Sequence, residues 1–126
     1  METEKKNRLG SVARAAFEEA WKVTQASAFA TALDKGWLPM DKEPNHAEQV
    51  CLMHAELSEA CEYLRIDKAA PSEKIPEFTG LEEELADVII RIMSYSGRTG
   101  LNVAGAIIRK MDYNMERDYK HGGKKF

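Results

Sequence analysis

The feature that most constrains the fold of this chain is the near absence of strand-type patterning. No segment of the 126 residues sustains an alternation of apolar and polar side chains, and Ala, Glu, Leu, Met and Lys dominate the stretches between a few prolines and glycines. Those residue types favour helices, whereas a period of two indicates a half-buried strand. The sequence therefore predicts an all-α protein, folded as a four-helix bundle.

Helix signals divide the chain into four segments. Three of the helices are expected over about residues 11–35, 46–65 and 102–119. Asn45 and Glu48 form a capping-box pattern at the start of the second helix, because the Asn side chain can accept from the backbone N–H three residues later. The first helix carries a seam of mostly small residues at three- and four-residue steps, which favours packing against another helix. These residues are Val12, Ala16, Ala20, Val23, Ser27 and Ala30.

The third expected helix follows a long connection over residues 66–80. Loops of this length in small domains are often lids or binding loops, and this one has room for a short helical turn. Thr79 and Glu82 repeat the capping-box pattern and open the third helix. Gly97 and Gly100 are expected to end it, since glycine is common just beyond the last turn of a helix.

Length and charge narrow the class of protein. A chain of 126 residues is expected to form one domain around one hydrophobic core. Residues 1–10 are expected to fray, and residues 120–126 form a basic tail that contains glycine. The 18 Lys and Arg residues against 21 Asp and Glu residues give a net charge of −3. This balance offers no bulk positive charge to attract nucleic acid.

The sequence also gives an expectation for where the protein works. No apolar run approaches the roughly 18 residues of a membrane helix, because Arg91 interrupts the most apolar stretch. The charged N-terminus is followed by no apolar signal segment. Cys51 and Cys61 lie ten positions apart in one expected helix, beyond the reach of a disulfide. We expect a cytoplasmic protein with reduced thiols and no membrane contact.

Two pairs of carboxylates carry the main chemical signal. Glu56 and Glu59 are three positions apart on the second expected helix, and Glu84 and Asp87 on the third, so each pair projects side by side. Both pairs lie among apolar residues, which places them near the edge of the core. Two packed helices would bring the four acids together, and a bound cation would relieve their repulsion. Three neighbouring acids are expected to be solvated, capping or supporting groups: Glu62, Glu82 and Glu83.

The ligand type predicts which ion and which substrate would bind. A set of oxygen donors alone favours a hard ion, Mg²⁺ with Mn²⁺ as a substitute, over zinc. Mg²⁺ commonly shares its coordination shell with phosphate oxygens. The four acids therefore predict a metal site that acts on a phosphorylated substrate.

Basic and aromatic side chains elsewhere could contact such a substrate. Lys110, Asn114 and Arg117 follow at four- and three-residue steps and form one polar stripe on the fourth expected helix. Cations in such a stripe can bind phosphate oxygens. Lys124 in the glycine-containing tail could add charge around an anion, and Trp37 could stack on a base.

The order of these features resembles a known family, the all-α nucleoside triphosphate pyrophosphohydrolases, or MazG-like group, which includes dimeric dUTPases and dCTP pyrophosphatases. The family signature is ExxE, a spacer and ExxD. Here Glu56-Leu-Ser-Glu59 is followed, after 24 intervening residues, by Glu84-Leu-Ala-Asp87. The later Lys110-x-x-x-Asn114-x-x-Arg117 and His121-Gly-Gly-Lys124 resemble the small stand-alone members. The resemblance covers about residues 35–126.

This resemblance implies a reaction and a set of roles. The enzyme would cleave a nucleoside triphosphate between its α and β phosphates, giving a nucleoside monophosphate and pyrophosphate. Glu56, Glu59, Glu84 and Asp87 would hold Mg²⁺, which lowers the pKa of the attacking water, and Glu59 would be the general base. Lys110, Asn114 and Arg117 of the fourth helix would bind phosphate or sugar. The resemblance also implies a homodimer or a dimer of dimers, to which the seam of the first helix would contribute.

Two alternative interpretations stay open at this level. The acids could form a solvated face of a non-catalytic helical module that binds a partner helix. The metal site could instead serve a related helical phosphohydrolase that acts on another phosphoanhydride, such as that of phosphoribosyl-ATP. The first alternative predicts no dependence on metal. Cleavage at the γ phosphate would release orthophosphate instead of pyrophosphate.

Overall fold

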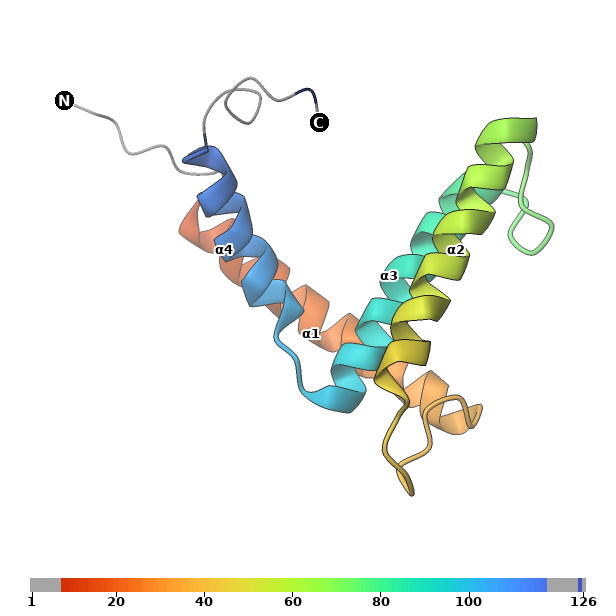
Figure 1. Cartoon of the computed structure of the whole chain (residues 1–126). Coiled ribbons are helices and arrows are strands. Elements are labelled where there is room, and N and C mark those ends of the chain that lie inside the picture. Colours follow the sequence, from red (N-terminus) through yellow and green to blue (C-terminus); the bar gives the residue numbers. More distant parts are fainter. Residues whose placement is uncertain (1–7, 118–124, 126) are drawn as a thin grey trace. The chain divides into compact units, whose positions relative to one another are not determined.

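The computed structural model describes residues 8–117 and residue 125. Within that part of the chain the regular structure is entirely helical, which confirms the all-α prediction. The order of elements is shown in Figure 1. The helices are α1 (Ser11–Asp34), α2 (His46–Ile66), α3 (Gly80–Thr99) and α4 (Val103–Met115).

The starts of α2, α3 and α4 are fixed by side-chain caps. Asn45 accepts a hydrogen bond from the Glu48 backbone N–H over 3.1 Å, as its position in the sequence predicts. Thr79 and Glu82 form the complete capping box, each side chain accepting from the backbone of the other residue. Asn102 caps α4 in the same way. These caps satisfy backbone donors that the first turn of a helix leaves unpaired.

The predicted end of the third helix is confirmed in part, and that of the fourth is wrong. α3 runs through Gly97 to Thr99 and is capped, as predicted, by Gly100, which has a φ of 76° in the left-handed region. Gly97 instead lets α1 come close, because a Cβ at this position would lie 2.8 Å from Cβ of Phe29. α4 ends at Met115 instead of near Tyr119, which lies outside the described residues. Of the predicted basic tail, only Lys125 belongs to the described residues.

The chain comprises two compact units. One comprises residues 8–23 and 101–117, where Arg14 donates two hydrogen bonds of 2.7 and 2.8 Å to the Asp112 carboxylate. The other is Thr24–Gly100. The predicted single-domain organisation stays a prediction.

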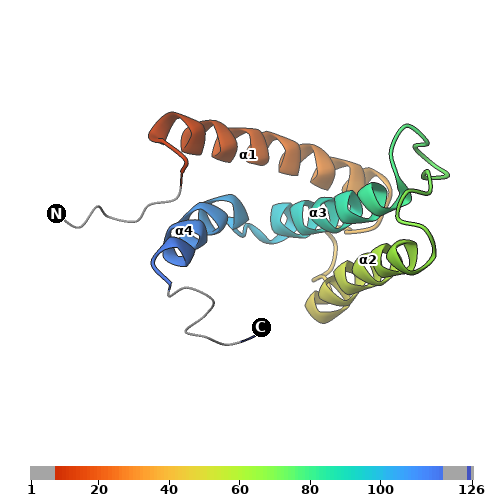
Figure 2. The same ribbon diagram turned by 90° about the horizontal axis from the view of Figure 1, so that it is seen from above.

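The unit Thr24–Gly100 is built on a hairpin of α2 and α3, which pack side by side in both views (Figures 1 and 2). The C-terminal part of α1 packs on α3, where Ser94 Oγ donates to the Ala28 carbonyl over 3.3 Å. Buried apolar side chains of this unit come from all three helices and from the segment after α1: Ala32, Leu38, Ala60 and Met93. The hairpin places one face of α2 against α3, and this packing positions the acidic residues.

The loop between α2 and α3 contains no additional helix, so the short helical turn considered for it does not form. It folds back on itself through an isolated antiparallel bridge between Pro71 and Thr79. Across the described residues, no helix combines the length and apolar content needed to cross a membrane.

Candidate functional site

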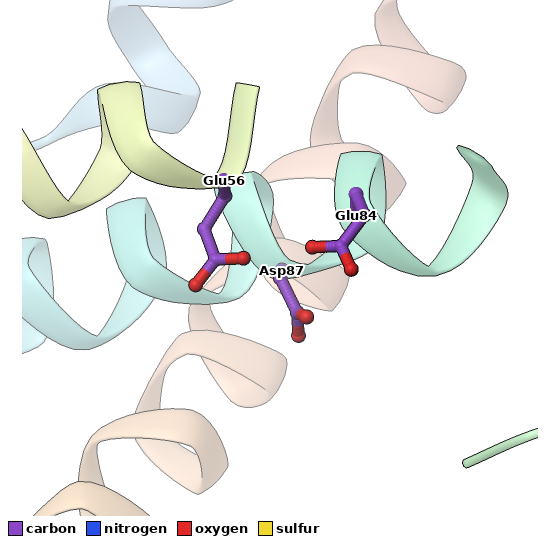
Figure 3. Close-up of side chains that lie close together, drawn as sticks. All are labelled: Glu56, Glu84 and Asp87. Carbon is purple, nitrogen blue, oxygen red and sulfur yellow. The ribbon is translucent and has the colours of Figure 1, made fainter. Parts of the chain in front are cut away.

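Three of the four predicted acids converge where α2 packs on α3. Glu56 comes from α2, and Glu84 and Asp87 come from successive turns of α3. One carboxylate oxygen from each residue lies within 4.8 Å of the other two. Figure 3 shows the three side chains close together. Glu84 and Asp87 lie together because they are three positions apart on α3, and the packing of α2 on α3 adds Glu56. We call these three residues the acidic cluster.

The acidic cluster is partly withdrawn from solvent. Glu84 is only 8% exposed, and the side chain of Glu56 is 12% exposed. Glu84 Oε2 is buried and has no hydrogen-bond partner among the described residues. A buried acceptor without a partner is uncommon in folded proteins, because its lost hydration is not repaid. The arrangement is therefore incomplete without a proton or a cation at this oxygen.

Burial and crowding make Glu84 an unusually weak acid. Its burial, together with the neighbouring carboxyl groups of Glu56 and Glu59, raises the pKa of Glu84 to about 8. Burial also raises the pKa of Asp87, and the charges of Glu56 and Glu83 add to this effect. The protein thus holds fewer than the full set of negative charges near neutral pH unless a cation compensates them.

Arg91 offsets part of this repulsion. Its Nε donates a 2.8 Å hydrogen bond to Glu56 Oε1. Burial alone would raise the pKa of Glu56, but the hydrogen bond from Arg91 and its charge lower the pKa overall, so Glu56 is the readily ionised member of the cluster. Arg91 is not among the site residues that the sequence predicts. A signal was present, since Arg91 is the charged residue inside the apolar stretch from Val88 to Met93.

Glu59 lies beside the acidic cluster instead of in it. Its side chain is exposed, and its oxygens are not part of the three-carboxylate group. It is nevertheless close enough for its charge to raise the pKa of Glu84. The structure therefore places Glu59 at the solvent side of the other three predicted metal ligands and outside their group.

The other acids near the site have the supporting roles expected of them. Glu83 is buried and accepts a 2.7 Å hydrogen bond from Ser72 Oγ. Glu82 belongs to the capping box of α3. Glu62 is exposed and accepts a hydrogen bond from Arg65, three residues further along α2.

A cavity of about 450 Å³ adjoins the acidic cluster within the unit Thr24–Gly100. Its polar and charged lining residues are Glu48, Gln49, Glu56, Lys74, Asp87, Arg91 and Ser94. Its apolar lining includes Leu38, Leu52, Ile90 and the 68% exposed side chain of Trp37. A space of this size can hold a small molecule with both a charged and an apolar part.

The predicted substrate-binding residues of the fourth helix do not line this cavity. Lys110, Asn114 and Arg117 are exposed and belong to the other compact unit. The Lys110 ammonium lies 4.4 Å from the centre of the Tyr113 ring, a cation–π contact. Lys124 lies outside the described residues. Two cations that the sequence interpretation did not assign to the site, Lys74 and Arg91, line the cavity instead.

Comparison with family models, with curated proteins and with solved structures gives no match for this chain. The chemistry of the site is therefore the basis for assigning a function. Three convergent carboxylates and the unpartnered Glu84 Oε2 fit a hard divalent cation, which takes oxygen ligands and would favour the ionised form of Glu84.

Proposed function

We propose that this protein is a Mg²⁺-dependent nucleoside triphosphate pyrophosphohydrolase, with Mn²⁺ as a substitute ion. The observation that carries the proposal is the convergence of Glu56, Glu84 and Asp87 at a cavity that also contains Lys74 and Arg91. Carboxylates for a divalent ion beside cations and an apolar wall suit a phosphorylated ligand with a ring. Cleavage between the α and β phosphates rests on the resemblance to the MazG-like group.

In this proposal Glu56, Glu84 and Asp87 would hold the ion, with Glu59 at its edge. Bound there, Mg²⁺ supplies charge neutralisation for the phosphates and makes water more acidic. Glu59 is exposed and outside the three-carboxylate group, so it is free to accept the proton of the water that attacks the α phosphorus. The bond to the β phosphate breaks, and pyrophosphate leaves.

The cavity supplies positions for the rest of a nucleotide. Trp37 presents an exposed ring at the cavity wall, where a base could stack on it. Arg91 orients Glu56 through its hydrogen bond and keeps this carboxylate ionised. Roles for Lys110, Asn114, Arg117 and Lys124 in binding phosphate or sugar follow from the resemblance alone.

The proposal is tested by measuring product release. Purified protein is incubated with Mg²⁺ and a panel of canonical and modified nucleoside triphosphates, and pyrophosphate and orthophosphate are quantified separately. We expect pyrophosphate, and its loss in Glu59→Gln and Glu84→Gln. Glu62→Gln is the matched control, because Glu62 is an exposed acid on the same helix as Glu59 with a hydrogen-bond partner of its own.

The alternatives give different results in the same assay. Release of orthophosphate alone would indicate cleavage at the γ phosphate and contradict the proposed reaction. Folded protein that releases neither product from any nucleotide, and is not stabilised by Mg²⁺ or Mn²⁺, would favour a non-catalytic helical module.

A further inference from the structure

The loop between α2 and α3 is a closed structure that is fixed to α3 at its base. The Ser72 backbone N–H donates to the Phe78 carbonyl, and the Gly80 N–H donates to the Ala70 carbonyl, each over 2.9 Å. Gly80 packs so closely on Tyr63 of α2 that a Cβ would overlap the Tyr63 ring. These contacts hold the two ends of the loop together beside the acidic cluster.

A single buried hydroxyl fixes the inside of this loop. Ser72 is 1% exposed, and its Oγ donates to Glu83 Oε2 over 2.7 Å. The same oxygen accepts from the backbone N–H groups of Lys74, over 3.2 Å, and Ile75, over 3.0 Å. The hydroxyl thus uses both its donor and its acceptor capacity, and it ties the backbone at Lys74 to α3.

The Lys74 side chain extends from this fixed backbone to the cavity, where it is a lining residue with Glu56 and Asp87. Its Nζ forms an ion pair with Glu83 Oε1 at 3.9 Å, a separation longer than a hydrogen bond, and its side chain is 83% exposed. Arg91, the other cation of the cavity, is already engaged with Glu56. Because the Lys74 ammonium is exposed and too far from Glu83 Oε1 for a hydrogen bond, it can turn toward an incoming anion.

We infer that Lys74 binds a phosphate oxygen of the substrate from the backbone position that the Ser72–Glu83 hydrogen bond fixes. The inference rests on the proposed function, and it adds to that function a phosphate-binding group that comes from the loop. An ammonium on a fixed backbone beside a metal site can contact phosphate without occupying a ligand position of the ion. The loop thereby makes the site selective for anions.

The test compares Lys74→Gln with Lys68→Gln, since Lys68 is an exposed lysine of the same loop that does not line the cavity. We expect Lys74→Gln to lower kcat/KM for pyrophosphate release, and to weaken inhibition by inorganic pyrophosphate, by about tenfold to hundredfold, the size of one charged hydrogen bond. Lys74→Arg should restore much of both. Thermal stability and Mn²⁺ affinity without nucleotide should match those of the wild type.

Each other result decides against the inference. If Lys74→Gln behaves like Lys68→Gln while the wild type releases pyrophosphate, the inference is wrong and the proposed function stands. If Lys74→Gln lowers Mn²⁺ affinity as much as it lowers kcat/KM, Lys74 acts on the ion site instead of on phosphate. A wild-type protein that releases no pyrophosphate from any nucleotide overturns the proposed function together with this inference.

Discussion

The acids of the cluster are of one chemical type, yet their surroundings give them different proton affinities. Arg91 donates to Glu56 and keeps its pKa below the ordinary value. Burial and two neighbouring carboxyl groups raise the pKa of Glu84 to about 8. Such divergence is typical of sites where carboxylates bind cations or move protons. The charge state of each carboxyl group therefore depends more on the residues packed around it than on its own residue type.

The raised pKa of Glu84 predicts how the stability of the metal-free protein depends on pH. The ordinary glutamate pKa is 4.5 and that of native Glu84 is about 8, so between these values the native state binds more protons than the unfolded chain. The contribution of Glu84 to the free energy of unfolding is therefore fully present below 4.5 and is lost as the pH rises through 8. Glu84→Gln cannot ionise and lacks this loss.

Urea unfolding in EDTA at about pH 5.5 and about pH 8.5 measures this difference. The wild-type midpoint should fall more than that of Glu84→Gln between the two conditions. Equal falls in the two proteins would show that Glu84 ionises normally in the native state.

The Arg91–Glu56 pair predicts a loss of stability when the arginine is removed. Arg91→Gln leaves a largely buried Glu56 carboxylate without its charged donor. We expect a destabilisation of roughly 1–3 kcal/mol in the metal-free protein, the cost of an unsatisfied buried acceptor. Arg65→Gln is the control, because the exposed Arg65–Glu62 pair should contribute less than about 1 kcal/mol. Equal effects in denaturant titrations would contradict this assignment.

At the scale of elements, the sequence predicts most of what local interactions decide. The caps at Asn45 and Thr79 depend on residues three positions apart, so the starts of α2 and α3 could be predicted from the sequence. The pairing of Glu84 with Asp87 follows in the same way from helix periodicity. Glu56 and Arg91 meet across 35 positions, and this contact depends on how α2 packs on α3. Neither the spacing of residues nor the composition of the sequence predicts this contact.

Gly97 shows the same limit within one helix. Glycine near the end of an apolar pattern predicts a helix end, because that is its commonest local use. Here the absence of a side chain serves a tertiary contact, since Phe29 of α1 lies against the Gly97 backbone. A local pattern cannot distinguish these two reasons for a glycine.

This contact makes the effect of Gly97→Ala a test of packing against helix propensity. Propensity alone would stabilise the protein by about 1 kcal/mol, since alanine is the better helix former. The added Cβ would lie 2.8 Å from Cβ of Phe29, an atom next to the backbone that cannot swing away. We expect packing to dominate and the protein to lose roughly 1–3 kcal/mol. A rise in the thermal midpoint of the variant would contradict the close packing of α1 on α3.

For the whole molecule, metal binding should appear as added stability. An ion that binds only the folded protein stabilises it by about 2.7 kcal/mol at a concentration about a hundredfold above its Kd. We expect Mn²⁺ or Mg²⁺ to raise the thermal midpoint, and EDTA to reverse the rise. Glu84→Gln should lose the response, because it removes one carboxylate of the acidic cluster, whereas Glu62→Gln should keep it. An equal rise in all three proteins would place ion binding elsewhere on the chain.

The balance of buried and exposed apolar residues predicts self-association. Half of the six buried apolar residues of the described chain are alanines, namely Ala32, Ala60 and Ala104. Larger apolar side chains remain exposed on each helix of the α2–α3 hairpin, with Leu57 at 43% and Ile89 at 46%. A chain of this size buries only a small hydrophobic core. Packing against a second copy of the chain would bury these exposed apolar side chains and add to that core.

We therefore expect light scattering after gel filtration to give at least twice the 14.2 kDa of one chain. The thermal midpoint should rise with protein concentration, because association stabilises the folded state by mass action. Leu57→Glu should reduce the mass and remove the concentration dependence, since it places a charge among the apolar side chains to be covered. Glu62→Gln, at an exposed site on the same helix, should leave both unchanged. A mass of one chain at every concentration would show that these side chains remain in contact with water.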